Sequence, residues 1–272
     1  MENAFELTFL GTNGSCSYNN GKRVRYGSNS SCIAASVGGE TLIFDTGTGI
    51  CGFKDLLNYQ RDHINIFYSH YHADHLRGLL FFPFLYDEKN VLDVYGHDAE
   101  HNDVRKVIEK LLTFPHHPVG LSSFSAKIEF HSIEPKAVFS LSPKILVKTY
   151  PLSHGSIGSV GYRVEYGGKV FCYCTDVELS KHENDTGLLE FMRDADLLVI
   201  DSYFDDGKVI GNWGHSSWRE CAEWAKQANA KKLALFHHRF EICDDELDEI
   251  EKKAQEVFKG AFTAADFMKI TL

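Results

Sequence analysis

The sequence predicts an α/β fold in which helices cover two stacked β-sheets, a four-layer αββα sandwich. In the first half of the chain, strand-like runs pass into an alternation of strands and helices, and the second half repeats this style. No break in composition, low-complexity linker or short-period repeat divides the 272 residues. We therefore expect one domain over residues 1–272, which is long enough to bury a large core.

The strands of the first half are short apolar runs that end at turn residues. Gly38-Gly39 lies between two of them and is a hairpin signal, because glycine tolerates the backbone angles of a tight turn. Residues 50–59 and 99–112 have helical periodicity and are expected to cover this sheet. The predicted strands are residues 5–10, 32–37, 41–44, 64–68 and 91–95.

The second half follows the same pattern with six further strand-like runs. These are residues 127–131, 145–150, 161–166, 170–174, 197–200 and 233–236. Residues 218–228 are predicted to form a helix, and residues 244–258 an amphipathic helix. Cys172 and Cys174 flank a tyrosine within one of these strands and are expected to be small core residues.

Composition limits the classes of function. The formal net charge of −10 argues against a long phosphate backbone as the main partner, because such binding depends on a basic surface. No run approaches the length of a membrane span, and the first residues lack the features of a signal peptide. The seven scattered cysteines are expected to be free thiols. Together these features predict a cytoplasmic protein without a membrane partner.

Residues 68–78, Tyr-Ser-His-Tyr-His-Ala-Asp-His-Leu-Arg-Gly, are the most informative segment. Four residues of metal-binding type, His70, His72, Asp74 and His75, directly follow an apolar strand. Buried His and Asp side chains must be paired or bound to metal, and these are too dense to find separate partners. The spacing of His70 and His72 puts them on one side of an extended segment. The alternative is a polar loop of exposed histidines.

Similar residues stand at the ends of three more predicted strands: His154, Asp176 and the pair His237-His238. Strand ends at one sheet edge collect functional groups. With one His of the pair, the set holds five His and two Asp, too many for one tetrahedral ion. It suits two ions that share a bridging carboxylate and leave a position for water. Five imidazoles without a thiolate favour zinc, with manganese and iron as alternatives.

This set resembles the metallo-β-lactamase superfamily over nearly the whole chain, and the resemblance implies the metallo-β-lactamase fold. The ligands it implies are His70, His72 and His154 for one ion, Asp74, His75 and His237 for the second, and Asp176 between them. It implies His237 rather than His238 as the ligand. Asp45, in Ile-Phe-Asp-Thr-Gly, matches the family's early Asp-x-Gly turn, which braces the metal loop.

The bridging residue separates branches of this family. β-Lactamases of the common zinc type carry Cys where this chain has Asp176, so antibiotic hydrolysis is not expected. A bridging Asp resembles the dinuclear hydrolases, which include phosphodiesterases, tRNase Z, and thioester and lactone hydrolases.

A second motif, Asn-Trp-Gly-His-Ser-Ser-Trp at residues 212–218, precedes a predicted helix that Ser216 or Ser217 can cap. His215 then lies near the positive end of the helix, where an anionic phosphate oxygen is favoured. A histidine in a polar turn is the alternative. With Asp201 at a strand end, His215 resembles the acid–histidine pair of tRNase Z and the cyclic phosphate phosphodiesterases.

This resemblance implies catalytic roles for three residues. His215 would protonate the leaving oxygen, Asp201 would orient His215, and Asp74 would orient the attacking water. Lactonases and thioesterases of this fold generally lack the pair, so phosphodiester hydrolysis is favoured over them.

The expected substrate is small. tRNase Z normally has a long basic exosite arm, and this sequence has no basic, glycine-rich insertion of that type. Residues 11–15 and 26–32 resemble the start of small bacterial and phage enzymes, and residues 114–119 resemble their Phe-Pro flap. His116 and His117 on this segment could contact substrate or be exposed between two prolines. The remaining histidines, His63, His97, His101, His131 and His182, are expected to be structural or on the surface.

The sequence therefore predicts a dinuclear metal phosphodiesterase that acts on a small, cyclic nucleotide or sugar phosphate. Two alternatives stay open: another hydrolase of this fold, acting on RNA ends, lactones or thioesters, and a non-catalytic metal-binding module. Related small phosphodiesterases are often dimers, which allows a homodimer, although no sequence feature shows an interface.

Overall fold

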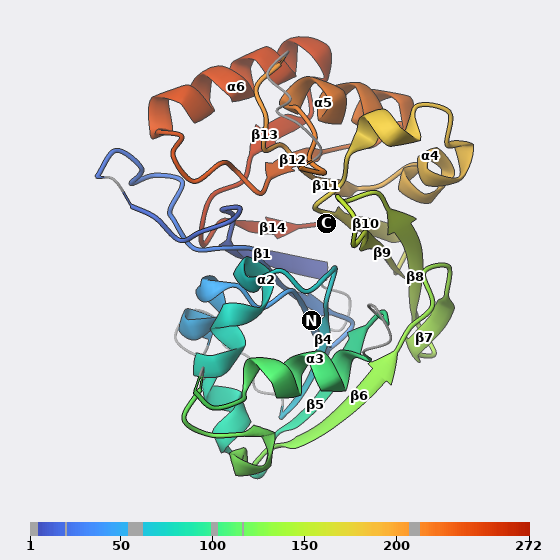
Figure 1. Cartoon of the computed structure of the whole chain (residues 1–272). Helices are drawn as coiled ribbons and strands as arrows, with labels where there is room; N and C mark the ends of the chain where they lie inside the picture. The colour runs from blue at the N-terminus through green and yellow to red at the C-terminus, as the bar shows by residue number, and fades with distance from the viewer. Residues whose placement is uncertain (1–4, 20, 54–61, 99–102, 116, 207–212) are drawn as a thin grey trace.

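The computed structural model describes residues 5–19, 21–53, 62–98, 103–115, 117–206 and 213–272. Two seven-stranded sheets pack face to face, and helices lie outside them (Figure 1). This four-layer arrangement confirms the predicted fold class. Within the described ranges, no helix combines the length and apolar character that a membrane span requires.

The first sheet has the strand order β14-β1-β2-β3-β4-β5-β6. β2 and β3 form the predicted hairpin, and β3 to β6 pair in parallel. Parallel strands end at the same edge, so the residues that follow β3 and β4 are neighbours. The bounds are β1 Phe5–Gly11, β2 Cys32–Val37, β3 Glu40–Phe44, β4 His63–Phe67, β5 Val91–Gly96, β6 Lys127–Ser132 and β14 Lys269–Thr271.

The second sheet has the order β13-β12-β11-β10-β9-β8-β7. β10 to β13 pair in parallel, whereas β7 to β10 pair antiparallel. β8 therefore runs in the same direction as β10, β11 and β12, and all four end at the same edge. The bounds are β7 Val138–Ser142, β8 Ile145–Leu152, β9 Ser159–Tyr166, β10 Lys169–Cys174, β11 Leu197–Asp201, β12 Leu233–Phe236 and β13 Ala261–Thr263.

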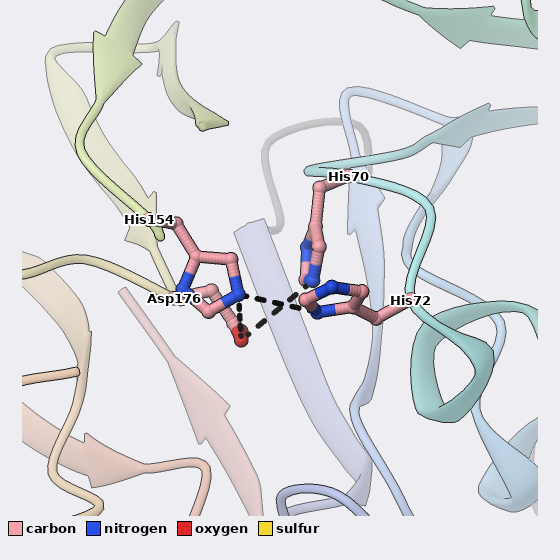
Figure 2. A group of neighbouring side chains, drawn as sticks. All are labelled: His70, His72, His154 and Asp176. Atoms are coloured by element: carbon pink, nitrogen blue, oxygen red, sulfur yellow. Dashed lines mark hydrogen bonds and ion pairs between the residues drawn. The ribbon is translucent and has the colours of Figure 1, made fainter. Parts of the chain in front are cut away.

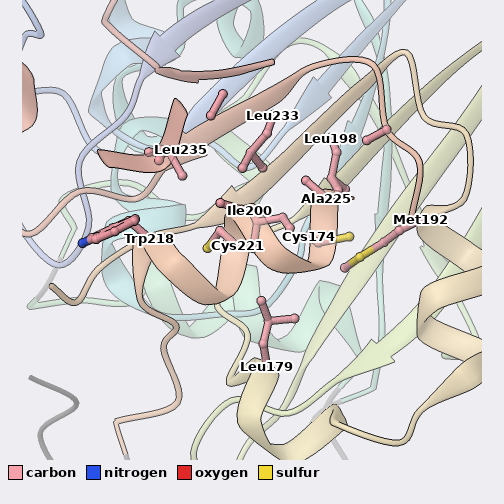
Figure 3. Packing of buried hydrophobic residues seen from close by; sticks show 14 of the residues in the cluster. Cys174, Leu179, Met192, Leu198, Ile200, Trp218, Cys221, Ala225, Leu233 and Leu235 are labelled. Atoms are coloured by element: carbon pink, nitrogen blue, oxygen red, sulfur yellow. The ribbon is translucent and has the colours of Figure 1, made fainter. Parts of the chain in front are cut away.

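The helices cover the outer faces through apolar stripes. α5, Trp218–Gln227, begins at Ser217, whose side chain forms a reciprocal capping box with Glu220. Its Trp218, Cys221 and Ala225 are buried at helical spacing against residues of β11 and β12 (Figure 3). The other described α-helices are α2 Ala73–Leu76, α3 Val104–Leu111, α4 Thr186–Met192 and α6 Asp244–Val257.

The structure departs from the predicted elements mainly where elements are short. β7, β13, β14 and α4 were not predicted, because three to seven residues carry too little periodicity to recognise. Of the predicted helix at 50–59, the structure describes residues 50–53, where a 3₁₀ turn, Thr48–Gly52, is found. The predicted helix at 99–112 is shorter, since α3 starts at Val104, and residues 99–102 lie outside the described part.

Candidate metal centre

The side chains of the segment after β4, residues 68–76, point in two directions. The segment leaves the strand in an extended conformation and becomes helical at α2, for which His72 is the N-cap residue. The Asp45 carboxylate at the end of β3 accepts hydrogen bonds from the Ser69 amide (2.8 Å) and hydroxyl (2.7 Å), which hold the start of the segment. As a result, His70 and His72 face one group of residues, while Asp74 and His75 face another.

The first group contains His70, His72, His154 and Asp176 (Figure 2). Their donor atoms lie within 4.8 Å of one another. His154 Nε2 is 3.2 Å from His72 Nδ1 and 3.5 Å from Asp176 Oδ1. His70 Nε2 is 3.7 Å from the same Asp176 oxygen.

The second group contains Asp74, His75 and His237. His237 Nε2 lies 3.2 Å from Asp74 Oδ2 and 3.3 Å from His75 Nε2. The second oxygen of Asp176, Oδ2, is 3.3 Å from His75 Nε2 and 3.4 Å from His237 Nε2. Asp176 thus presents one oxygen to each group, which is the arrangement of a bridging carboxylate.

These groups fit two divalent ions. Ligands about 2.0–2.1 Å from a tetrahedral zinc ion lie about 3.3–3.4 Å from one another. The measured separations of 3.2–3.7 Å are close to that spacing. In addition, His70 Nε2 is fully buried without a hydrogen-bond partner, which is costly unless it meets a cation.

Hydrogen bonds on the far side of two imidazoles orient them toward the centre. His75 Nδ1 lies 2.8 Å from Asp45 Oδ2, and His154 Nδ1 lies 2.8 Å from the Gly214 carbonyl oxygen. Each Nδ1–H can donate to its acceptor, so the lone pair of Nε2 points inward, as metal ligation requires. Gly214 is needed here because a Cβ would lie 2.7 Å from His154 Nδ1.

The protonation states of two ligands suit metal binding, whereas a metal ion would have to displace a proton from His75. Burial acts to lower the pKa of His75, but the Asp176, Asp74 and Asp45 carboxylates outweigh it and raise the pKa well above its usual value. Burial lowers the pKa of His70 well below its usual value, which keeps the imidazole neutral. Burial acts to raise the pKa of the Asp176 carboxyl, but the imidazoles of His237 and His75 outweigh it and hold the pKa well below its usual range. Neutral imidazole and ionised carboxylate are the forms that bind divalent ions.

Three residues of the site have a left-handed backbone directly after a strand. Asp45 (φ 57°), Asp176 (φ 55°) and His237 (φ 56°) follow β3, β10 and β12 closely. A non-glycine residue in this region costs about 1–2 kcal/mol. At each position the chain turns sharply and brings the functional side chain back over the sheet edge.

His215 and Asp201 lie next to both groups. His215 Nδ1 is 2.8 Å from Asp201 Oδ2, and the His215 ring is 5.0 Å from the His154 ring and 5.1 Å from the His237 ring. Burial acts to lower the pKa of His215, but the Asp201 carboxylate outweighs it and raises the pKa to about 9. Ser217 caps α5, so His215 lies two residues before the N-cap.

Sequence reasoning missed Tyr203 and the role of Ser15. The Tyr203 ring stacks on His215 at 4.6 Å and 17°, and its hydroxyl lies 3.2 Å from Ser15 Oγ. The Ser15 amide donates to Asp74 Oδ2 at 2.7 Å. Tyr203 stands two residues after Asp201, and Ser15 closes the Gly-Thr-Asn-Gly-Ser segment, but neither spacing predicts these contacts.

The remaining histidines lie away from this centre or have other partners. His238 Nε2 is 2.9 Å from the Ala264 carbonyl oxygen, and burial lowers its pKa to about 3, so His237 alone of the pair joins the cluster. His117 Nδ1 is 2.7 Å from the Val119 carbonyl oxygen. His116 and His101 lie outside the described residues. The others, His63, His97, His131 and His182, are not part of either group.

Comparison with known proteins places these residues in a family context. The model of the Beta-lactamase superfamily domain matches residues 40–238. A ribonuclease Z of Picrophilus torridus is 24% identical in an alignment that covers 100% of this chain and 97% of the relative.

Two solved structures share the fold. The metallo-β-lactamase fold protein YhfI of Bacillus subtilis has a TM-score of 0.73 at 20% identity and covers 99% of this chain and 100% of its own. The short form of human tRNase Z has a TM-score of 0.70 at 23% identity, with 97% of this chain and 98% of its own covered.

Proposed function

The chain belongs to the metallo-β-lactamase superfamily, and we propose that it hydrolyses a small, cyclic phosphodiester with the aid of two divalent metal ions. It is a metal-dependent hydrolase of the phosphodiesterase branch of that superfamily. One observation carries the finer proposal: the hydrogen-bonded pair His215–Asp201 lies directly beside the paired ligand groups. A histidine held there can give a proton to an oxygen that leaves phosphorus.

The two ions would be held by the seven ligands described above, with Asp176 shared. When bound, they would supply positive charge for the phosphate oxygens and lower the pKa of a coordinated water. Nitrogen-rich ligation favours zinc, and manganese or iron remains an alternative.

The side chains then have separate tasks in the reaction. Asp74 and Asp176 can accept hydrogen bonds from the attacking water and orient it toward phosphorus. The Ser15 amide fixes the Asp74 carboxylate through the 2.7 Å bond. As the new P–O bond forms, the bond to the leaving oxygen breaks, and His215 donates its Nε2 proton to that oxygen. Asp201 holds the opposite nitrogen of the ring, Nδ1.

Charge and length support a small substrate. The net charge of −10 disfavours a long polyanion. The alignment with the Picrophilus torridus ribonuclease Z spans 310 positions, so at least 38 of them (310 less 272) have no counterpart here. The relative thus carries residues that this chain lacks, as it would if an exosite arm were among them.

Replacing His215 tests the proposed role. In His215→Ala, we expect metal content to survive while hydrolysis of 2′,3′-cyclic AMP falls about 10²–10⁴-fold, the usual contribution of a general acid. Bis(4-nitrophenyl) phosphate should be partly spared, because nitrophenolate leaves without a proton.

The matched control is His131→Ala, which removes a partly exposed imidazole on β6 outside both groups. This variant should keep both activities. Equal losses on the two substrates in His215→Ala would show that His215 is not the acid.

A ribonuclease that acts on RNA ends is the second candidate, since a relative named ribonuclease Z aligns over the whole chain. A panel of cyclic mononucleotides, bis(4-nitrophenyl) phosphate, a tRNA precursor and an acyl lactone separates the candidates. Cleavage of the precursor with little turnover of the mononucleotides would favour the ribonuclease. Whether the protein is a homodimer stays a prediction.

A further inference from the structure

A cavity of about 280 Å³ lies next to the candidate metal centre, between Tyr203, the segment after β12 and α6 (α6 is labelled in Figure 1). Two residues connect it to the centre. Tyr203 lines the cavity and stacks on His215, and Arg239 lines it two residues after His237.

The position of the cavity identifies which part of a substrate reaches it. His215 donates its proton to the leaving oxygen, so the leaving alcohol must lie on the His215 side of the phosphorus. Tyr203 lies against His215, with ring centroids 4.6 Å apart. Tyr203 is therefore shared by the cavity and by the histidine beside which the alcohol leaves.

The walls combine an aromatic and apolar surface with acidic side chains. Tyr203, Ile242 and Ile250 supply the apolar part. Trp213, which is 58% exposed, lies near Tyr203 with ring centroids 6.5 Å apart and offers an aromatic face to a base. The charged lining is Asp205, Asp245, Glu246, Glu249, Arg239 and Lys253, four carboxylates against two cations.

This excess of carboxylates selects against anions. An alcohol that carries a further phosphate would meet like charge at the mouth of the site, which costs affinity. Ion pairs with side chains outside the lining reduce this excess without removing it. Glu249 lies 2.7 Å from Lys252 and Asp245 lies 3.8 Å from Arg25, while Arg239 Nε lies 3.4 Å from Glu241. An uncharged alcohol avoids this repulsion, and carboxylates accept hydrogen bonds from its hydroxyl and amino groups.

We propose that this cavity is the subsite for the leaving alcohol and that it accepts an uncharged nucleoside while rejecting one with an additional phosphate. The inference rests on the proposed phosphodiesterase activity. In a cyclic nucleotide the nucleoside that carries the leaving oxygen keeps its phosphate in the product, so the subsite is tested on linear diesters, from which the nucleoside departs. The inference also defines a substrate class, since a leaving RNA chain carries further phosphates and a nucleoside does not.

The test compares two deoxydinucleotides, dAdA and pdAdAp. Whichever oxygen leaves, the departing nucleoside is uncharged in dAdA and phosphorylated in pdAdAp. At low salt, where charges are least screened, we expect kcat/KM for dAdA to exceed that for pdAdAp by about tenfold or more. In Glu249→Lys this preference should fall by about fivefold or more.

Glu256→Lys is the matched control, because Glu256 is exposed on the same helix but does not line the cavity. It should keep the wild-type preference. A wild-type ratio near one, no cleavage of dAdA, or an equal change in both lysine variants would overturn the subsite.

Bis(4-nitrophenyl) phosphate separates this failure from failure of the proposed function. If it is hydrolysed without any preference between the dinucleotides, only the subsite is wrong. If no diester is hydrolysed, the phosphodiesterase proposal fails and the subsite fails with it.

Discussion

At the scale of single residues, Asp45 is the main organiser of the metal-binding segment. Its buried carboxylate accepts hydrogen bonds from the Ser69 amide and hydroxyl, from His75 and from the Tyr173 hydroxyl, at 2.7–2.8 Å. It joins β3, the segment after β4, and β10 of the second sheet. The strand-end position of Asp45 was visible in the sequence, but the contact with Tyr173, 128 residues away, was not.

We expect Asp45→Asn to weaken metal binding about 10–100-fold, as is usual when a partner of a metal-ligating histidine is lost. The neutral amide of asparagine accepts hydrogen bonds from His75 and Ser69 more weakly than a carboxylate does. The measurement is a zinc-binding isotherm in a series of chelator-buffered metal concentrations, with circular dichroism to confirm folding.

Tyr173→Phe is the control, because it removes one hydrogen bond and keeps the Asp45 charge. It should retain nearly normal zinc affinity. If Asp45→Asn binds zinc as the natural protein does, the carboxylate has no role in orienting His75.

At the scale of elements, α4 supports the loop that carries His154. Asp185 caps α4 by accepting from the Leu188 amide, and it also accepts from the Tyr150 hydroxyl. His182 lies between this carboxylate and Ser153. Its Nδ1 is 2.9 Å from Asp185 Oδ2, and its Nε2 accepts a hydrogen bond from the Ser153 amide at 3.0 Å. The chain of contacts therefore ends one residue before the ligand His154. None of it was predicted, because α4 is too short to recognise.

Stability should depend on pH through Asp185. Burial acts to raise the pKa of this carboxyl, but hydrogen bonds from Tyr150 and His182 outweigh it and lower the pKa from 3.8 to about 2. The folded protein thus holds the proton more weakly than the unfolded chain does. The ionised carboxylate stabilises the fold above pH 3.8, and this contribution is lost as the pH falls to 2.

Asp185→Asn keeps a capping side chain and removes the charge. We expect it to lower the free energy of unfolding by about 1 kcal/mol at pH 7, after allowance for solvent screening. The difference from the natural protein should shrink between pH 4 and pH 2 in urea titrations. A difference that stays constant with pH would show that the charge of Asp185 does not contribute.

At the scale of the whole molecule, an aromatic core joins the two sheets. Phe44 of β3 stacks on Phe67 at 5.4 Å and meets Phe171 and Tyr173 of the second sheet at 5.2 and 5.5 Å. The same interface carries Asp45, which follows Phe44. Packing between the sheets and alignment of the site therefore depend on one another.

Phe44→Ala should lower the free energy of unfolding by about 3–5 kcal/mol, because a large buried ring leaves a cavity. Phe81→Ala, at a position that is 66% exposed, is the control and should change stability by about 0.5 kcal/mol or less. Urea unfolding measured by circular dichroism gives both values. Equal effects at the two positions would contradict the central place of Phe44.

The same titrations test whether residues 1–272 form one domain. All three tryptophans, Trp213, Trp218 and Trp224, lie in the second half, so their fluorescence follows that half alone. Circular dichroism follows both halves. Coincident transitions support a single domain, and separate transitions would divide the chain.

The sequence by itself determined the layers and the chemical types of the site. Most strands are long enough for their apolar pattern to be recognised in the sequence. The His and Asp residues that follow these apolar runs can be recognised there as well. Which contacts those residues make was decided by the tertiary structure. The family resemblance already implied Asp176 between the two ions and His237 rather than His238 as a ligand. It did not predict the stacking of Tyr203 on His215, the bond from the Ser15 amide to Asp74 or the bond from the Tyr173 hydroxyl to Asp45. The physical reason is that these contacts depend on the packing of two sheets and on left-handed turns after their strands, which local patterns do not encode.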